Sequence, residues 1–126
     1  MKLPYRNNAI IPRKKLTHYL LNLEHKDGKS KAKFFRGIGF SEINLDKFEQ
    51  ELLKVAKENK VTLVNKSKSK RVKYDPVIKY SIIGSINAPN GKRYMVETGW
   101  VRETGKKIPR LTSAYAYSII RKRKEK

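Results

Sequence analysis

Cysteine is absent from the sequence, which excludes disulfides, zinc–thiolate sites and cysteine nucleophiles. Histidine is rare, and the two present, His18 and His25, do not have the spacing of a metal-ligand pair. No apolar run reaches membrane-spanning length, and the N-terminal residues lack the apolar stretch of a signal peptide. We therefore expect a soluble, cytoplasmic protein that uses neither a metal ion nor another cofactor.

Acidic residues are also few. The chain has 11 Asp and Glu against 31 Lys and Arg, so its formal net charge is +20 over 126 residues. A charge of this size opposes the compact state by self-repulsion unless an acidic partner relieves it. Nucleic acid, an acidic protein and an anionic membrane surface are the candidates. The third lacks the amphipathic or lipidated segment that membrane attachment needs.

The length suits a single domain, residues 1–126. We expect an N-terminal arm (1–8), a helical part (9–58), a sheet (60–118) and a basic tail (119–126). No internal repeat indicates a second copy of any unit. Helices followed by strands are typical of an α+β fold.

Three helices are expected in the first half, over about residues 12–23, 30–36 and 45–59. Apolar residues recur every three or four positions in the first and third of them, which is the helical period. Ser30 and Asn44 are the expected N-caps of the second and third. The inward-facing residues are Leu16, Tyr19, Leu20 and Leu23 in the first helix and Leu45, Phe48, Leu52 and Val55 in the third.

An alternating pattern then predicts four antiparallel strands, which begin near Val61 and continue over about residues 77–87, 92–103 and 108–117. Residues 66–73 carry five basic side chains with Ser spacers and are expected as a basic loop or edge strand. We therefore predict about three N-terminal helices packed on one face of a four-stranded antiparallel meander.

The turns predict which residues share a face of this sheet. A two-residue Asn-Gly turn at 90–91 places Ser81 opposite Trp100, and a three-residue loop at 104–106 places Arg110 opposite Trp100 as well. The first face would hold Lys79, Ser81, Thr98, Trp100, Arg102, Arg110 and Thr112. The second, apolar face would take the helices and hold Ile78, Tyr80, Ile82, Ile86, Met95, Val101, Leu111 and Tyr115. Arg93 and Glu97 also fall on the second face and count against this register, and a slip of one residue would exchange the faces of the fourth strand.

The first face has the composition of a phosphodiester-binding site. Trp100 would stack on a base, Arg110 would hold phosphate oxygens through its planar fork, and Thr112 would donate a hydrogen bond to phosphate. Lys79 and Arg102 would hold the RNA chain. The alternative left open is an ordinary solvated sheet face with a tryptophan at its edge.

His25 is the candidate for proton transfer, because Lys29, Lys31 and Lys33 follow it closely. RNA cleavage needs a base to activate the 2′-hydroxyl and an acid for the leaving oxygen. His25 would serve as one of these, Lys31 would stabilise the charged phosphorane, and Lys29 and Lys33 would bind RNA. The alternative is a turn histidine beside a solvated basic helix. His18, which lies off the apolar stripe, is interpreted as structural or solvated.

Five motifs carry a family resemblance that covers most of the chain: N-A-I-I-P-R-K-K-L-T-H-Y-L-L-N (8–22), H-K-D-G-K-S-K-A-K-F-F-R-G-I-G-F (25–40), P-N-G-K (89–92), T-G-W (98–100) and P-R-L-T-S-A-Y (109–115). The chain resembles an uncharacterised bacterial domain-of-unknown-function family whose members look like small toxin modules. Its order of helices and strands is similar to that of the barnase, EndoU, colicin and RelE group of metal-independent ribonucleases.

This resemblance implies RNA cleavage at a basic sheet face and a dedicated protein antitoxin. The residues that it favours are His25, Lys31, Trp100, Arg110, Thr112 and Tyr115. Two positions depart from the expected pattern: Gly99 stands in place of a β-branched residue and Ala116 in place of a proline.

We therefore expect an endoribonuclease toxin of a toxin–antitoxin or polymorphic-toxin system, inhibited by an acidic antitoxin that covers the basic face. Two other interpretations stay open. One is a basic nucleic-acid-binding protein without catalytic activity, and the other is an interaction module for an acidic protein.

Overall fold

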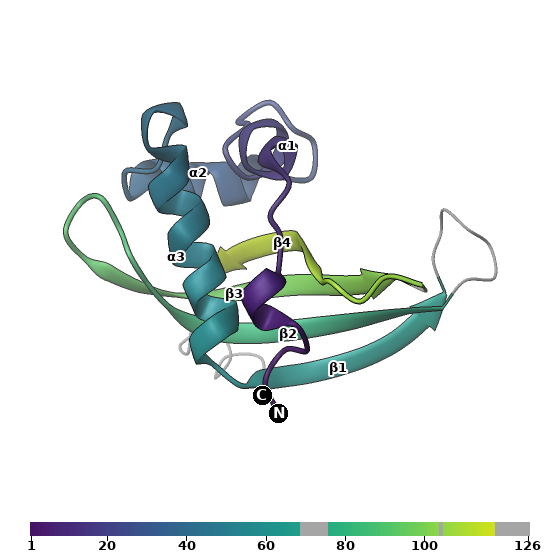
Figure 1. Cartoon of the computed structure of the whole chain (residues 1–126). Coiled ribbons are helices and arrows are strands. Elements are labelled where there is room, and N and C mark those ends of the chain that lie inside the picture. Colours follow the sequence, from purple (N-terminus) through teal and green to yellow (C-terminus); the bar gives the residue numbers. More distant parts are fainter. Residues whose placement is uncertain (69–75, 104, 118–126) are drawn as a thin grey trace, which may run out of the picture.

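The structure is a computed structural model, and it describes residues 1–68, 76–103 and 105–117 of the chain. Three helical segments come first and pack against one face of a four-stranded antiparallel meander (Figure 1). The strands are β1 (Val61–Lys68), β2 (Pro76–Asn87), β3 (Arg93–Glu103) and β4 (Arg110–Ala116), and they neighbour one another in this order. The predicted α+β fold class is confirmed. Residues 69–73 of the predicted basic loop (66–73) and the whole predicted tail (119–126) lie outside the described residues.

Helix α3 (Leu45–Glu58) ends within one residue of its predicted boundary, and its predicted stripe faces the sheet. Its fully buried residues include Phe48, Leu52 and Val55. The predicted Asn44 cap is replaced by a different contact, because the Asn44 side chain makes no capping bond to α3. Instead, Asn44 Oδ1 accepts the Ser41 N–H at 2.8 Å, and Ser41 Oγ accepts the Ile43 N–H at 3.4 Å. These bonds form a capping box around the preceding 3-10 turn, η3 (Glu42–Asn44).

The first helical segment is shorter than its apolar period predicts. Helix α1 (Arg13–Lys15) continues directly into a π-helical turn, η2 (Leu16–Leu20), and the helix ends there. Leu21 is fully buried, whereas Leu23 is 45% exposed. The expected inward position of Leu23 is therefore wrong, because the chain leaves the helical path before that residue.

Helix α2 (Lys29–Gly37) begins one residue before the predicted Ser30 cap. Gly28 occupies the N-cap position, so no side chain of that residue can cap the helix. Phe35, on its inner face, is fully buried in the common core. The segment before Gly28 takes over the capping role, as described below for His25.

The first eight residues are not a free arm. Leu3 is fully buried, and the carbonyl of Met1 accepts the Val61 N–H at 2.7 Å. Farther along, Ile10 forms a parallel bridge with Arg110 of β4. The N-terminal segment therefore contacts both edge strands of the sheet, which corrects the prediction of a separate arm.

The pairing of β2 with β3 differs from the predicted register by one residue. Tyr80 lies opposite Trp100, where the two-residue turn predicts Ser81. Because side chains alternate between faces, this single step moves Tyr80 and Trp100 to the same face of the sheet.

The turn at residues 88–91 explains the shift. The Gly91 N–H binds the Ala88 carbonyl at 3.0 Å, and Gly91 has a φ of 87°. Asn90 does not share this left-handed conformation, which a two-residue Asn-Gly turn would require. Pro89, with its fixed negative φ, suits the second position of an ordinary turn. The loop therefore has three residues, and the register moves by one.

A β-bulge displaces β4 against β3 as well. The register shifts between Gly99 and Trp100, so that Trp100 lies opposite Leu111 and Val101 lies opposite Arg110. The predicted Trp100–Arg110 pair is therefore wrong. Its two members occupy opposite faces, because Trp100 and Val101 are consecutive residues of one strand.

We name the two sides of the sheet by what covers them. The core face packs against the helices, and the outer face is the other one. The core face carries the predicted apolar residues Ile78, Tyr80, Ile82, Ile86 and Leu111, together with Val96, Thr98, Trp100, Arg102 and Ala114. The prediction is wrong for Met95, Val101 and Tyr115, which lie on the outer face.

Candidate functional site

The predicted surface on which Trp100 would stack against a base does not exist. Trp100 is fully buried, and its indole Nε1 donates a hydrogen bond to Thr98 Oγ1 at 2.8 Å. Thr98 in turn donates to the carbonyl of Ile82 at 3.0 Å. A side chain in this position cannot stack on a base, so Trp100 is a core residue and its predicted role is corrected.

Arg110 also differs from its predicted role as a free phosphate clamp. Its Nε donates to Glu103 Oε1 at 2.8 Å, so a carboxylate already neutralises its charge. Lys79 is exposed and lies on the same outer face, opposite Val101. Thr112 Oγ1 lies beside Gly99, where a Cβ on residue 99 would approach it to 3.0 Å. The glycine that departs from the expected pattern therefore leaves room for this hydroxyl.

Tyr115 is 40% exposed and lies opposite Glu97 on the outer face. Burial, together with hydrogen bonding to Glu97 and the charge of that carboxylate, raises the pKa of Tyr115 to about 12. A phenol with this pKa stays protonated at neutral pH. Tyr115 can therefore donate a hydrogen bond there, but it cannot act as a base.

A second group of residues comes together between the helices and β4, and we call it the Tyr19 cluster: Lys15, Tyr19, His25, Lys31 and Ser113. The Nζ atoms of Lys15 and Lys31 lie 4.9 and 5.3 Å from the centre of the Tyr19 ring. The His25 ring packs edge-on against Tyr19 at 4.8 Å between centroids. The hydroxyl oxygens of Tyr19 and Ser113 are 3.4 Å apart. All five side chains are half-buried.

The surroundings of Tyr19 change its acidity. Burial alone raises the pKa of the phenol, but hydrogen bonding from Ser113 and from Lys31 lowers it. The positive charges of Lys31 and Lys15 lower it further, so that the pKa of Tyr19 lies below its ordinary value of 10.0. A larger fraction of Tyr19 is therefore in the phenolate form near neutral pH than in an isolated tyrosine.

His25 has a structural role in the cluster. Its Nδ1 accepts the N–H groups of Asp27 and Gly28, both at 3.0 Å. A ring nitrogen that accepts hydrogen bonds carries no proton, so the proton of the neutral ring is on Nε2. His25 caps the start of α2 in this form and has no free lone pair for a substrate proton. The general-base part of the His25 prediction is corrected for this reason, whereas its part as a general acid, through the Nε2–H, stays a prediction.

The other predicted lysines divide between two sides of α2. Lys31 is half-buried against Tyr19, whereas Lys29 and Lys33 are exposed and lie one helical turn apart. The structure therefore brings His25 and Lys31 together and leaves Lys29 and Lys33 on the neighbouring solvent face.

The centre of the cluster, Tyr19, is missing from the predicted site residues because its spacing also fits the apolar stripe. One signal in the sequence points to it in retrospect. Lys15 precedes Tyr19 by four positions, a spacing that places an ammonium beside the ring on a helix. The approach of Ser113 to Tyr19 depends on a bulge in the strand pairing and has no such signal.

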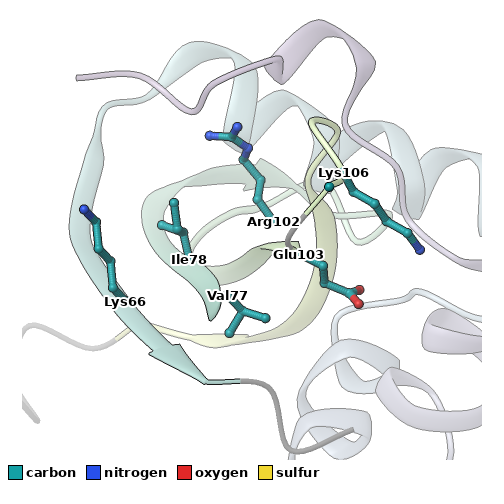
Figure 2. Close-up of a pocket in the computed structure, with 7 residues that line it drawn as sticks. Lys66, Val77, Ile78, Arg102, Glu103 and Lys106 are labelled. Atoms are coloured by element: carbon teal, nitrogen blue, oxygen red, sulfur yellow. The ribbon is translucent and has the colours of Figure 1, made fainter. Parts of the chain in front are cut away.

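A pocket of about 350 Å³ opens at the end of the sheet where β2 begins and β3 ends (Figure 2). We call it the Arg102 pocket. It is lined by Lys66, Val77, Ile78, Arg102, Glu103, Gly105 and Lys106. Of the predicted RNA-binding residues, Arg102 alone lines it.

In the described part of the chain, no three His, Asp or Glu side chains gather closely enough to hold a metal ion. No helix in the same residues has the length and apolar character needed to cross a membrane.

The fold and the Tyr19 cluster define a small, strongly basic α+β domain with a tyrosine held between two lysines. Residues 2–118 match the model of a family described as "Domain of unknown function (DUF6883)", and the chain belongs to this family. No curated protein and no solved structure matches the chain. The family match confirms the resemblance to a domain of unknown function, while its toxin and ribonuclease part stays a prediction.

Proposed function

We propose that this protein binds RNA and cleaves it without a metal ion at the Tyr19 cluster. The observation that carries the proposal is the position of the Tyr19 phenol, half-buried between Lys15 and Lys31, with its pKa lowered. Groups with a perturbed pKa beside specific charge partners are typical of catalytic sites. The net charge of +20 supports RNA as the polyanionic substrate.

Two backbone irregularities support this placement. Tyr19 lies in the π-helical turn η2, and Ser113 lies next to the β-bulge of β4. Both kinds of irregularity are frequent beside functional sites, because each redirects side chains away from the regular pattern. Here they bring two hydroxyl groups together.

The proposed reaction is an internal transesterification of RNA. The Tyr19 phenolate accepts the proton of the 2′-hydroxyl, whose oxygen forms a new bond to phosphorus. The bond from phosphorus to the 5′-oxygen breaks, and the leaving oxygen takes a proton from the Lys31 ammonium. The products are a 2′,3′-cyclic phosphate and a 5′-hydroxyl. Lys15 stabilises the extra negative charge on the phosphorane, and the Tyr19 hydroxyl returns its proton to Lys31.

Cleavage of total RNA in the presence of EDTA tests this proposal. Tyr19→Phe removes one oxygen atom, and we expect it to lower the cleavage rate by about 100-fold or more, the range for loss of a general base. Lys31→Met should act in the same direction. The matched controls are Tyr117→Phe and Lys57→Met, which make the same changes outside the cluster and the predicted RNA-binding residues and should retain most of the rate. Intact RNA with the wild-type protein, or an unchanged rate in Tyr19→Phe, would overturn the catalytic proposal.

A non-catalytic RNA-binding protein is the second candidate, and the exposed lysines Lys29 and Lys33 on α2 favour it. This function predicts intact RNA in every lane together with RNA affinity that falls steeply with salt, because bound phosphates release counterions. Affinity that is independent of salt would contradict it.

The toxin part of the proposal rests on charge and on the need to control a ribonuclease. An acidic protein partner complements a net charge of +20 and would cover the Tyr19 cluster. Expression of the wild-type chain in bacteria should arrest growth, whereas Tyr19→Phe should not. Co-expression of a small acidic protein encoded beside its gene should restore growth and copurify with the chain. Normal growth with the wild-type chain alone would contradict a toxin role.

A further inference from the structure

We propose that the Arg102 pocket binds the phosphate group of a ligand, either within an RNA chain or in a free nucleotide. The pocket lies at the end of the sheet and shares no residue with the Tyr19 cluster. The inference therefore does not depend on catalysis at Tyr19.

The first argument is a row of residues across three strands. Lys66 on β1 lies opposite Ile78 on β2, and Ile78 lies opposite Arg102 on β3. Figure 2 shows the two cationic side chains on either side of Ile78. Neighbouring strands are about 4.8 Å apart, so the two backbones are separated by about 10 Å. Long cationic side chains at this separation can both reach one phosphate above Ile78.

The second argument is the unused hydrogen-bonding capacity of Arg102. Its Nη1 donates to the Tyr80 hydroxyl at 3.2 Å. Its Nε is buried and has no hydrogen-bond partner among the described residues. Buried donors are almost always satisfied, and an orphan donor is a known sign of a missing ligand, ion or water. A small rotation of the guanidinium would present its donors to a phosphate in the pocket, in the forked geometry that arginine uses for this group.

The third argument is the position of Tyr5. This residue has a φ of 56°, and it is the one non-glycine residue with a positive φ in the described ranges. The conformation is sparsely populated for a bulky side chain, and such strain gathers at ligand sites. It places the Tyr5 ring against the guanidinium of Arg102, with 5.5 Å between Arg102 Cζ and the ring centre. Tyr5 is therefore a positioning residue that attracts the Arg102 guanidinium through a cation–π contact.

The charge balance of the lining also favours an anion. Lys66 and Lys106 are exposed, whereas the carboxylate of Glu103 already accepts a bond from Arg110. Buried Val77 and half-buried Ile78 supply apolar surface for a sugar or base. The pocket volume of about 350 Å³ lies in the range of small-ligand sites.

Calorimetric titration of the whole chain at about 0.15 M salt tests the proposal. The probes are inorganic phosphate, adenosine 5′-monophosphate and a short 2′-O-methyl RNA, which cannot be cleaved. Arg102→Gln should weaken phosphate-dependent binding by about tenfold or more, as expected for loss of a charge-assisted hydrogen bond. Lys66→Ala should weaken it several-fold, and because Lys66 is exposed, this variant keeps the test valid if Arg102→Gln fails to fold. Lys57→Ala, which removes one exposed charge from α3, is the matched control and should change little.

The outcomes separate the possible ligands. If the two pocket variants bind all three probes more weakly, or only the mononucleotide and phosphate, while Lys57→Ala does not, the pocket is a free-nucleotide site. If they bind only the RNA more weakly, the pocket contacts an RNA chain. If Lys57→Ala weakens binding as much as the pocket variants do, the effect comes from the loss of non-specific charge, and the proposal is overturned. Unchanged binding in both pocket variants would also overturn it. Inorganic phosphate and the mononucleotide are not substrates of RNA cleavage, so their binding tests the pocket alone, and failure of the pocket remains distinguishable from failure of the catalytic proposal.

Discussion

The hydroxyl oxygens of Tyr19 and Ser113 lie 3.4 Å apart, although 94 residues separate them in the chain. One residue belongs to the π-helical turn η2 and the other to edge strand β4. The contact joins the first helical segment to the last strand, so the Tyr19 cluster forms only when the whole domain is folded. A partly folded chain would therefore lack the site.

The ionisation of Tyr19 and Tyr115 should be separable by ultraviolet titration. The pKa of Tyr19 is lowered from 10.0, and that of Tyr115 is raised to about 12. Tyr19→Phe should remove an absorbance step below pH 10, and Tyr115→Phe should remove a step near pH 12. Lys31→Met should move the lower step upward, because Lys31 favours the phenolate. A low step that persists in Tyr19→Phe would contradict this assignment.

Glu51 should stabilise the fold in a pH-dependent manner. This carboxylate on α3 is 6% exposed, accepts the Asn87 N–H at 2.6 Å and lies near the ammonium groups of Lys54 and Lys47. Burial raises its pKa, but these contacts outweigh burial, and the pKa of Glu51 falls below its ordinary value of 4.5. Its stabilising effect is thus complete above about pH 4.5 and disappears as pH falls through the lower, folded-state pKa.

Glu51→Gln should therefore lower the free energy of unfolding by about 1–2 kcal/mol at pH 7 and by less at pH 3. Urea denaturation at the two pH values measures both numbers. Glu58→Gln is the matched control, since Glu58 is exposed near the end of the same helix and should change stability little. An equal effect of Glu51→Gln at both pH values would show that its charge does not matter.

Gly39 should resist substitution for two independent reasons. Its φ is 113°, and a Cβ at this position would lie 2.8 Å from the Cβ of Pro89. Gly39→Ala should lower the free energy of unfolding by about 1–3 kcal/mol. Gly37→Ala is the control, because a Cβ at Gly37 meets nothing within 4 Å and the residue is helical. Thermal denaturation compares the two, and equal melting temperatures would contradict the argument.

Trp100 should behave as a core residue in solution. Trp100→Ala should cost about 3–5 kcal/mol of stability, the range for large core truncations. Met95 lies on the outer face and is 43% exposed, so Met95→Ala should cost much less stability. The fluorescence of the single tryptophan should resist quenching by iodide and should not be quenched by stacking when RNA is added. Strong quenching by either agent would place the indole at the surface.

The local pattern of the sequence is sufficient to predict most elements. The apolar period of α3 specifies its boundaries and its buried face, because a 14-residue helix with one apolar stripe has only one way to cover a sheet. The alternating residues of β2 and β3, separated by a Pro-Asn-Gly turn, specify a hairpin. The excess of basic residues likewise follows from composition alone.

The assignment of faces could not be read from the same pattern. Trp100 moves from the outer face to the core when the turn contains three residues in place of two, and both turns fit the sequence. The choice depends on long-range contacts at this loop, where the Asn90 N–H binds the carbonyl of Ile38 at 3.2 Å. The bulge at Gly99 adds a second shift of the register, which no local sequence pattern predicts.

By itself, then, the sequence determined the charge, the order of elements and the α+β class, because these depend on residue type and short-range periodicity. Only the tertiary structure decided that Trp100 is buried, that Arg110 is paired with Glu103, and that Tyr19 is the centre of a cluster. The physical reason is that side-chain direction in a sheet changes with every single residue, so contacts distant in sequence settle which groups meet.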